Sequence, residues 1–206
     1  MDTTSRTTSR FTATALAVTA TFVLLGPPGP EPEEAPVVVH GGDTAQQETV
    51  DWALGRFRST GLPPLPSFEV HLYTSHADCG GNLGYYRAGR IDLCTRDSSE
   101  PYARKFALHE MAHAWTVAHV DANTRARFMR LRGTAGWNDR GLPWKERGFE
   151  QAAEIIAWGI GEGAIQPLLP EPASDRELVE AFVLLTAHRP FNGAVAEPPP
   201  SGQGSP

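Results

Sequence analysis

The chain lacks several features that mark common functional classes. It has no run of Lys or Arg, and 18 basic residues against 24 acidic ones give a formal net charge of −6. Nucleic-acid binding ordinarily needs a basic patch, so we exclude that class of partner. No internal repeat is present, so a repeat architecture is not expected. A length of 206 residues with 40% hydrophobic and 20% charged residues suits one globular domain with tails.

The chain also lacks an apolar run long enough for an ordinary transmembrane helix. The segment from Phe11 to Leu25 is uncharged and mostly apolar, but it is shorter than the roughly 20 residues that span a bilayer. Arg6 and Arg10 precede it, so residues 1–25 are typical of a signal peptide. No clean cleavage site with small residues follows, which leaves a retained signal anchor as the alternative. Export is the expectation, with membrane contact only if the segment is kept.

Cysteine is scarce, and only Cys79 and Cys94 occur. An even pair in an exported chain favours a disulfide bond. Oxidising compartments maintain such bonds, so we expect a secreted or cell-surface protein.

Composition divides the rest of the chain into a domain and two tails. Residues 26–40 are rich in Pro and Glu and predict an extended linker, and residues 193–206 are poor in apolar residues and predict a disordered tail. The folded domain is expected over residues 41–192. Apolar periodicity, caps and turn residues predict one strand (68–72), a hairpin (83–94) and helices over 43–61, 98–119, 123–131, 149–160 and 175–188. This order predicts an α+β fold.

The segment His109-Glu110-Met111-Ala112-His113 is an HExxH motif inside the predicted helix 98–119. Residues four apart share one helix face, so His109 and His113 can bind the same ion. Glu110 flanks that face and can act as general base on a water molecule that the metal activates. The motif therefore predicts a catalytic site with one Zn²⁺ per chain.

A catalytic zinc needs a third protein ligand and an open fourth position. We expect Glu150 to supply it, because it lies near the start of a mostly apolar helix whose carboxylates need a partner. Glu154, on the same face, is expected to accept a hydrogen bond from a ligand histidine. The alternative third ligand is His119, whose spacing from His113 matches the HExxHxxGxxH pattern of metzincins. The glycine of that pattern is Thr116 here, and no Met-turn follows.

The sequence HEMAHAW followed by EQAAEIIAW resembles the gluzincin metallopeptidases, especially small single-domain zincins. It is also similar to phage-repressor-cleaving and radiation-response regulators, whose second helix reads E-x-x-A-x-x-F-A. Glu150, Ala153 and Ala157 match that form, and Ile156 replaces Phe. The leader and the cysteine pair resemble small exported actinobacterial proteins of this type. The likeness covers roughly residues 62–163.

The resemblance implies a zincin-like fold in which a small mixed sheet packs on the HExxH helix, followed by further helices. It also implies that the strand at 90–94 borders the cleft and pairs with a peptide substrate. The expected activity is hydrolysis of peptide bonds in a peptide or protein substrate. The alternative is a non-catalytic, zinc-stabilised module that binds a partner at the cell surface. Glu110 favours the enzyme, because a structural zinc site has no need of that carboxylate.

Overall fold

The computed structural model of the chain describes residues 36–162 and 165–193. Contacts divide the chain into Met1–Glu33 and Glu34–Pro206, and all of the described residues belong to the second unit. The predicted signal segment, residues 26–35 of the predicted linker and residues 194–206 of the predicted tail lie outside the described residues. Within the described ranges, no helix is long and apolar enough to cross a membrane.

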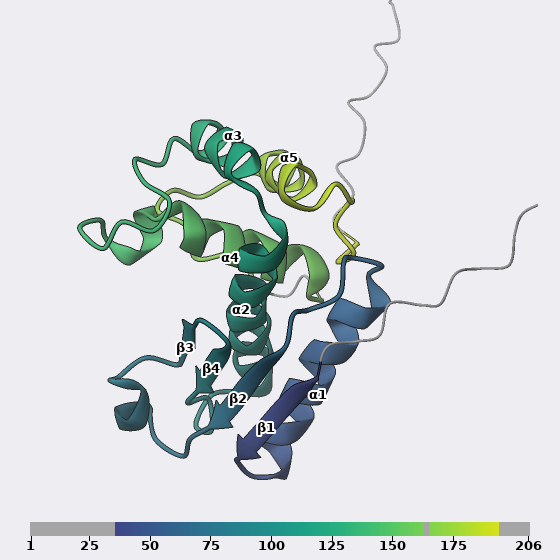
Figure 1. The fold of residues 1–206 in the computed structure, drawn as a ribbon, viewed down its shortest axis with the longest axis vertical. Helices are drawn as coiled ribbons and strands as arrows, with labels where there is room; N and C mark the ends of the chain where they lie inside the picture. The colour runs from purple at the N-terminus through teal and green to yellow at the C-terminus, as the bar shows by residue number, and fades with distance from the viewer. Residues whose placement is uncertain (1–35, 163–164, 194–206) are drawn as a thin grey trace, which may run out of the picture. The chain divides into compact units, whose positions relative to one another are not determined.

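The described residues combine one sheet with five α-helices (Figure 1). The order is β1 (Val37–Gly41), α1 (Thr44–Ser59), β2 (Phe68–Leu72), the 3₁₀ helix η1 (His76–Cys79), β3 (Gly84–Arg87), β4 (Arg90–Leu93), α2 (Glu100–His119), α3 (Ala122–Arg132), the 3₁₀ helix η2 (Trp144–Glu146), α4 (Gly148–Ile160) and α5 (Asp175–Thr186). The α+β prediction is confirmed.

The sheet has the strand order β1-β2-β4-β3, in which β3 alone runs antiparallel to its neighbour. Strand β2 alternates as the sequence predicts: Phe68, Val70 and Leu72 are buried, whereas Glu69 and His71 face the other side. The buried side chains join Ile91 and Leu93 of β4 in the core. The other face is mostly polar, with Val38 and Tyr85 exposed on it. One face of the sheet is therefore packed and one is accessible.

Local signals set the helix boundaries. The side chain of Asp43 accepts a hydrogen bond from the backbone of Gln46 and completes a capping box at the start of α1. The side chain of Asp121 accepts a hydrogen bond from the backbone N–H of Thr124 and caps α3, and Gly133 ends that helix in the left-handed conformation. Pro101 lies in the first turn of α2, where its missing N–H costs no helical hydrogen bond.

Helix α2 is the centre of the molecule. It packs against α1, α4, β3 and β4, and in Figure 1 it lies between the sheet and the group formed by α3, α4 and α5. Its residues from Ala107 to Thr116 are all buried, so the HExxH motif is enclosed by the rest of the fold. A polar motif that is buried in this way needs partners for its charged groups.

Two expectations about the strands are wrong. The predicted linker, residues 26–40, runs into β1, which begins with three consecutive valines at Val37 and pairs in parallel with β2. β-Branched residues favour a strand. The sequence analysis nevertheless included these valines in the linker, because the residues before them are rich in Pro and Glu. Strand β4 is also not available to a peptide, since β2 and β3 occupy both of its edges. The edge strand beside the HExxH helix is β3.

The predicted disulfide between Cys79 and Cys94 is present, and it joins η1 to the end of β4. No free cysteine occurs among the described residues. The bond is consistent with an oxidising compartment outside the cytoplasm.

Removing this disulfide is expected to lower the free energy of unfolding by about 3 kcal/mol, because the bond closes a loop between cysteines 15 positions apart. Urea denaturation of Cys79→Ala/Cys94→Ala against the wild type measures the change. Wild type in reductant serves as the control and should match the double variant. A difference below about 1 kcal/mol would show that the loop is already restrained by its packing.

Candidate metal centre

The two histidines of the motif project from one face of α2. The Nε2 atoms of His109 and His113 lie 3.1 Å apart, and the two rings meet edge to face. Both side chains are almost completely buried, with exposed fractions of 3% and 4%. Two imidazole nitrogens this close, pointing at one another, have room for at most one proton between them. This is the arrangement expected of two ligands of one ion.

Helix α4 brings a carboxylate to the same point. Oε2 of Glu150 lies 3.0 Å from Nε2 of His113 and 3.3 Å from Nε2 of His109. Three donor atoms therefore form a triangle with sides of 3.0, 3.1 and 3.3 Å. Ligands about 2.1 Å from a tetrahedral ion lie about 3.4 Å from one another. His109, His113 and Glu150 therefore fit a metal ion, and we call these three residues the buried triad.

The charges of the buried triad also suit a cation. Burial alone would lower the pKa of His109, but the carboxylates of Glu150, Glu154 and Glu110 raise it to about 10. Burial lowers the pKa of His113 to about 4. Burial works against ionisation of Glu150, yet its contacts with the two histidines hold its pKa at about 2. The surrounding carboxylates thus stabilise a positive charge at His109. A metal ion bound there would replace the proton of His109 and supply that charge.

Glu154 lies beside His109, but the predicted hydrogen bond between them is not formed. Its Oε1 is 3.1 Å from Nδ1 of His109, at an angle short of a well-formed hydrogen bond. Its Oε2 accepts a hydrogen bond from the backbone N–H of Leu168 at 2.7 Å and pairs with Nζ of Lys105 at 3.0 Å. The side chain of Glu154 is fully buried, so these contacts fix its carboxylate beside the imidazole.

Glu110 lies between α2 and the edge strand. Its carboxylate is buried, and burial raises its pKa to about 7, so it can exchange a proton near neutral pH. It rests against Gly84 of β3, where an added Cβ would meet Oε1 of Glu110 at 2.6 Å and its Cγ at 2.8 Å. The absence of a side chain at this strand position therefore makes room for the carboxylate.

Replacing Gly84 with Ala is expected to displace Glu110 without contacting the buried triad. If Glu110 is the general base that the HExxH motif predicts, a shift of about 1 Å lowers turnover by about 10- to 100-fold, and the loss should fall on kcat with metal content unchanged. Peptide-cleavage kinetics and metal analysis of the same sample measure both quantities. Gly55→Ala is the matched control, because a Cβ there meets nothing within 4 Å. Loss of metal from Gly84→Ala would assign Gly84 a structural role instead.

A cleft opens over this site. Glu110, His113 and Glu150 lie on its floor, and its walls come from β3, from the loop around Arg140 and from η2. Aromatic rings close in on the histidines. The ring centroid of Phe149 lies 4.2 Å from that of His113, and the ring centroid of Tyr86 lies 5.9 Å from it. On the other histidine, the ring centroids of Trp144 and His109 are 5.8 Å apart. Their apolar surfaces reduce the access of water to the histidines.

His119, the alternative third ligand, lies elsewhere. It is exposed at the end of α2, its Nε2 donates a hydrogen bond to the carbonyl oxygen of Pro64 at 2.8 Å, and its ring packs on Trp115. Helix α2 continues straight to His119, since no glycine turns the chain after His113. The structure thus brings His109, His113 and Glu150 together and leaves His119 outside.

Three residues at the site escaped the sequence analysis: Lys105, Gly84 and Phe149. Lys105 carried a usable signal, because it precedes His109 by four residues and so lies on the same face of α2. Gly84 and Phe149 carried none, because their roles depend on contacts with residues distant in the sequence.

Neither a family model nor a curated protein nor a solved structure matches this chain. The functional argument therefore depends on the geometry of the site.

Proposed function

We propose that the protein is a secreted zinc peptidase of the zincin type, with one tightly bound Zn²⁺ held by the buried triad. The observation that carries this proposal is the convergence of two imidazole nitrogens and one carboxylate oxygen within 3.3 Å of each other, with Glu110 beside them. Nitrogen donors from histidine with one carboxylate suit zinc better than Mg²⁺ or Ca²⁺. Three protein ligands at a cleft floor suit a catalytic site, since a structural zinc is closed by four.

A zinc ion held there supplies Lewis acidity, which polarises a substrate carbonyl and lowers the pKa of a water molecule toward about 7. Glu110 takes the proton of the attacking water as the water oxygen bonds to the carbonyl carbon of the peptide. The same carboxylate returns the proton to the amide nitrogen as the C–N bond breaks. A pKa of about 7 suits both steps, because the group must accept a proton and release it.

The edge strand β3 offers a place for the substrate. Within the described residues its only strand partner is β4, so its other edge can pair with an extended peptide through main-chain hydrogen bonds. Tyr85, Tyr86 and Arg87 of β3 line the cleft together with Glu110, so a peptide paired there passes the proposed catalytic groups. Tyr86 and Arg140, also at the cleft, are the candidate donors for the developing oxyanion.

The test uses the purified full-length chain, dialysed against metal-free buffer. Wild type should retain one zinc per chain and cleave members of a peptide library. A chelator should abolish cleavage, and zinc should restore it. His109→Ala and Glu150→Ala should lose zinc and activity together, whereas His119→Ala and Glu146→Ala, which alter exposed residues, should keep both. Wild type without a bound metal, or zinc retained by Glu150→Ala, would overturn the proposal.

A further inference from the structure

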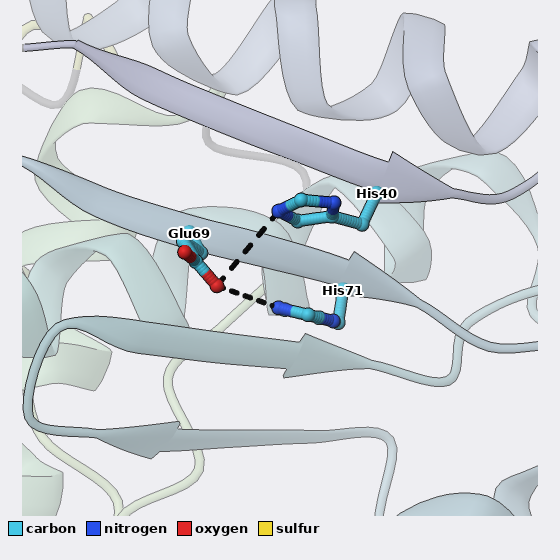
Figure 2. Close-up of side chains that lie close together, drawn as sticks. All are labelled: His40, Glu69 and His71. Atoms are coloured by element: carbon cyan, nitrogen blue, oxygen red, sulfur yellow. Dashed lines mark hydrogen bonds and ion pairs between the residues drawn. The ribbon is translucent and has the colours of Figure 1, made fainter.

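A second group of metal-binding side chains lies on the polar face of the sheet. His40 of β1 and His71 of β2 are direct register partners in the parallel pair, so their side chains leave the sheet next to each other. Glu69 precedes His71 by two residues and projects from the same face. Figure 2 shows the two rings side by side, with a nitrogen of each directed at the carboxylate of Glu69.

The distances bring these donors close to a coordination shell. Nε2 of His71 is 3.0 Å from Oε2 of Glu69, and Nε2 of His40 is 3.8 Å from the same oxygen. The rings stack with centroids 4.5 Å apart, and one donor atom from each residue lies within 4.8 Å of the others. His40 is 46% exposed and is free to close the longer distance.

The surrounding charges leave Glu69 available. The hydrogen bond with His71 has the largest effect in lowering the pKa of Glu69, and Arg90, the register partner of Glu69 on β4, contributes by attracting the carboxylate electrostatically. The guanidinium of Arg90 donates hydrogen bonds to Asp92 at 2.7 Å and to the hydroxyl of Tyr73 at 2.6 Å. The carboxylate of Glu69 therefore has the two histidines as its contacts, which is the composition of a two-nitrogen, one-oxygen metal site.

We propose that His40, Glu69 and His71 form a second metal site, which binds a divalent transition ion such as Zn²⁺, Ni²⁺ or Cu²⁺. Imidazole nitrogens select these ions over Mg²⁺ and Ca²⁺. The site is separate from the buried triad, since its residues face away from the side of β2 that packs into the core. With side chains 24% to 55% exposed, it holds its ion more weakly and leaves positions open to water.

Such an ion would cross-link β1 to the sheet. Within the described residues β1 has one strand neighbour, β2, so the main-chain pairing of this edge strand depends on that one neighbour. An ion with ligands on both strands stabilises the paired state, because the two strands offer a joint site only when they are in register. Zinc above the amount that fills the buried triad should therefore raise the melting temperature further.

The experiment removes all metal from the full-length chain with a chelator, exchanges it into metal-free buffer, and then titrates it with zinc by calorimetry. Wild type should bind two ions per chain, one tightly and one more weakly, and His40→Ala/His71→Ala should bind only the tight one. Glu69→Gln provides a second variant that removes the carboxylate without removing a ring. His119→Ala is the matched histidine control and should still bind two ions. The double variant should keep peptide cleavage and lose the second rise in melting temperature.

Paramagnetic Ni²⁺ gives a direct readout of the ligands. Added after the buried triad is filled with zinc, it should broaden the ring resonances of His40 and His71 before those of His119. Binding of a single ion by wild type, or retention of the weaker ion by His40→Ala/His71→Ala, would overturn the second site and leave the peptidase proposal standing. The peptidase proposal is tested separately by Glu150→Ala, which should lose the tightly bound ion and keep the weaker one.

Discussion

Replacing Glu110 with Gln should leave zinc bound and lower kcat/KM for peptide cleavage by about 10²- to 10⁴-fold, the usual contribution of a positioned general base. The amide has the shape of the carboxylate and fills the same buried space against Gly84, so the fold should not change. It cannot take a proton from water, however. Because Glu110 is not a member of the buried triad, zinc content should remain at one tightly held ion per chain.

The measurement pairs zinc analysis with kinetics on the same preparation. Glu146→Gln, an exposed carboxylate in η2, is the matched control and should behave as wild type. The combination of retained zinc and lost cleavage distinguishes a catalytic carboxylate from a ligand. Unchanged cleavage in Glu110→Gln would remove the proposed general base and would favour the alternative of a zinc-stabilised binding module.

Much of this site could be predicted because its main signal is local. His109 and His113 share a helix face through spacing alone, and the helix around them is recognisable from its apolar neighbours. Glu150 required one further step, since a carboxylate at the start of an apolar helix needs a buried partner. The structure brings Glu150 to the two histidines, as the sequence analysis expected.

Other features could not be predicted because they depend on long-range pairing. The parallel register that places His40 beside His71 joins strands separated by the whole of α1, and no turn between them specifies the alignment. The sequence alone therefore gives no indication that His40 and His71 lie next to each other. The order β2-β4-β3 likewise depends on which strand of the hairpin packs against β2. The sequence analysis placed the peptide beside the strand at 90–94, which is β4, whereas the edge strand of the hairpin is β3.

Lys105 escaped for a different reason. Its spacing from His109 places it on the same face of α2, but a lysine on a helix is ordinarily solvated, so the spacing alone does not indicate burial. Its side chain is only 8% exposed, and it lies next to a carboxylate that is fully buried. Charge burial of this kind becomes visible only once α2 and α4 are packed together. Lys105 also holds Glu154, which contacts His109, so the residues that position His109 include one that lies a helical turn before the motif on α2.

Lys105→Met is expected to lower the free energy of unfolding by about 3 to 5 kcal/mol, because it leaves the buried carboxylate of Glu154 without its cation. Methionine keeps most of the volume, so the loss reflects charge more than packing. Urea denaturation measures it, with Lys145→Met as the matched control. Lys145 is exposed, and its replacement should change stability by less than about 0.5 kcal/mol.

The double variant Lys105→Met/Glu154→Gln separates stability from metal binding. A neutral amide can still accept the hydrogen bond from the backbone of Leu168, so the double variant should be more stable than Lys105→Met alone. An amide oxygen is a weaker acceptor than a carboxylate for the ring of His109, and zinc affinity should fall by about tenfold in Glu154→Gln and in the double variant. Lys105→Met, which keeps that carboxylate, should bind zinc nearly as wild type does. Equal zinc affinity in all three variants would mean that Glu154 serves only to neutralise Lys105, and that His109 is oriented by the packing of α2 alone.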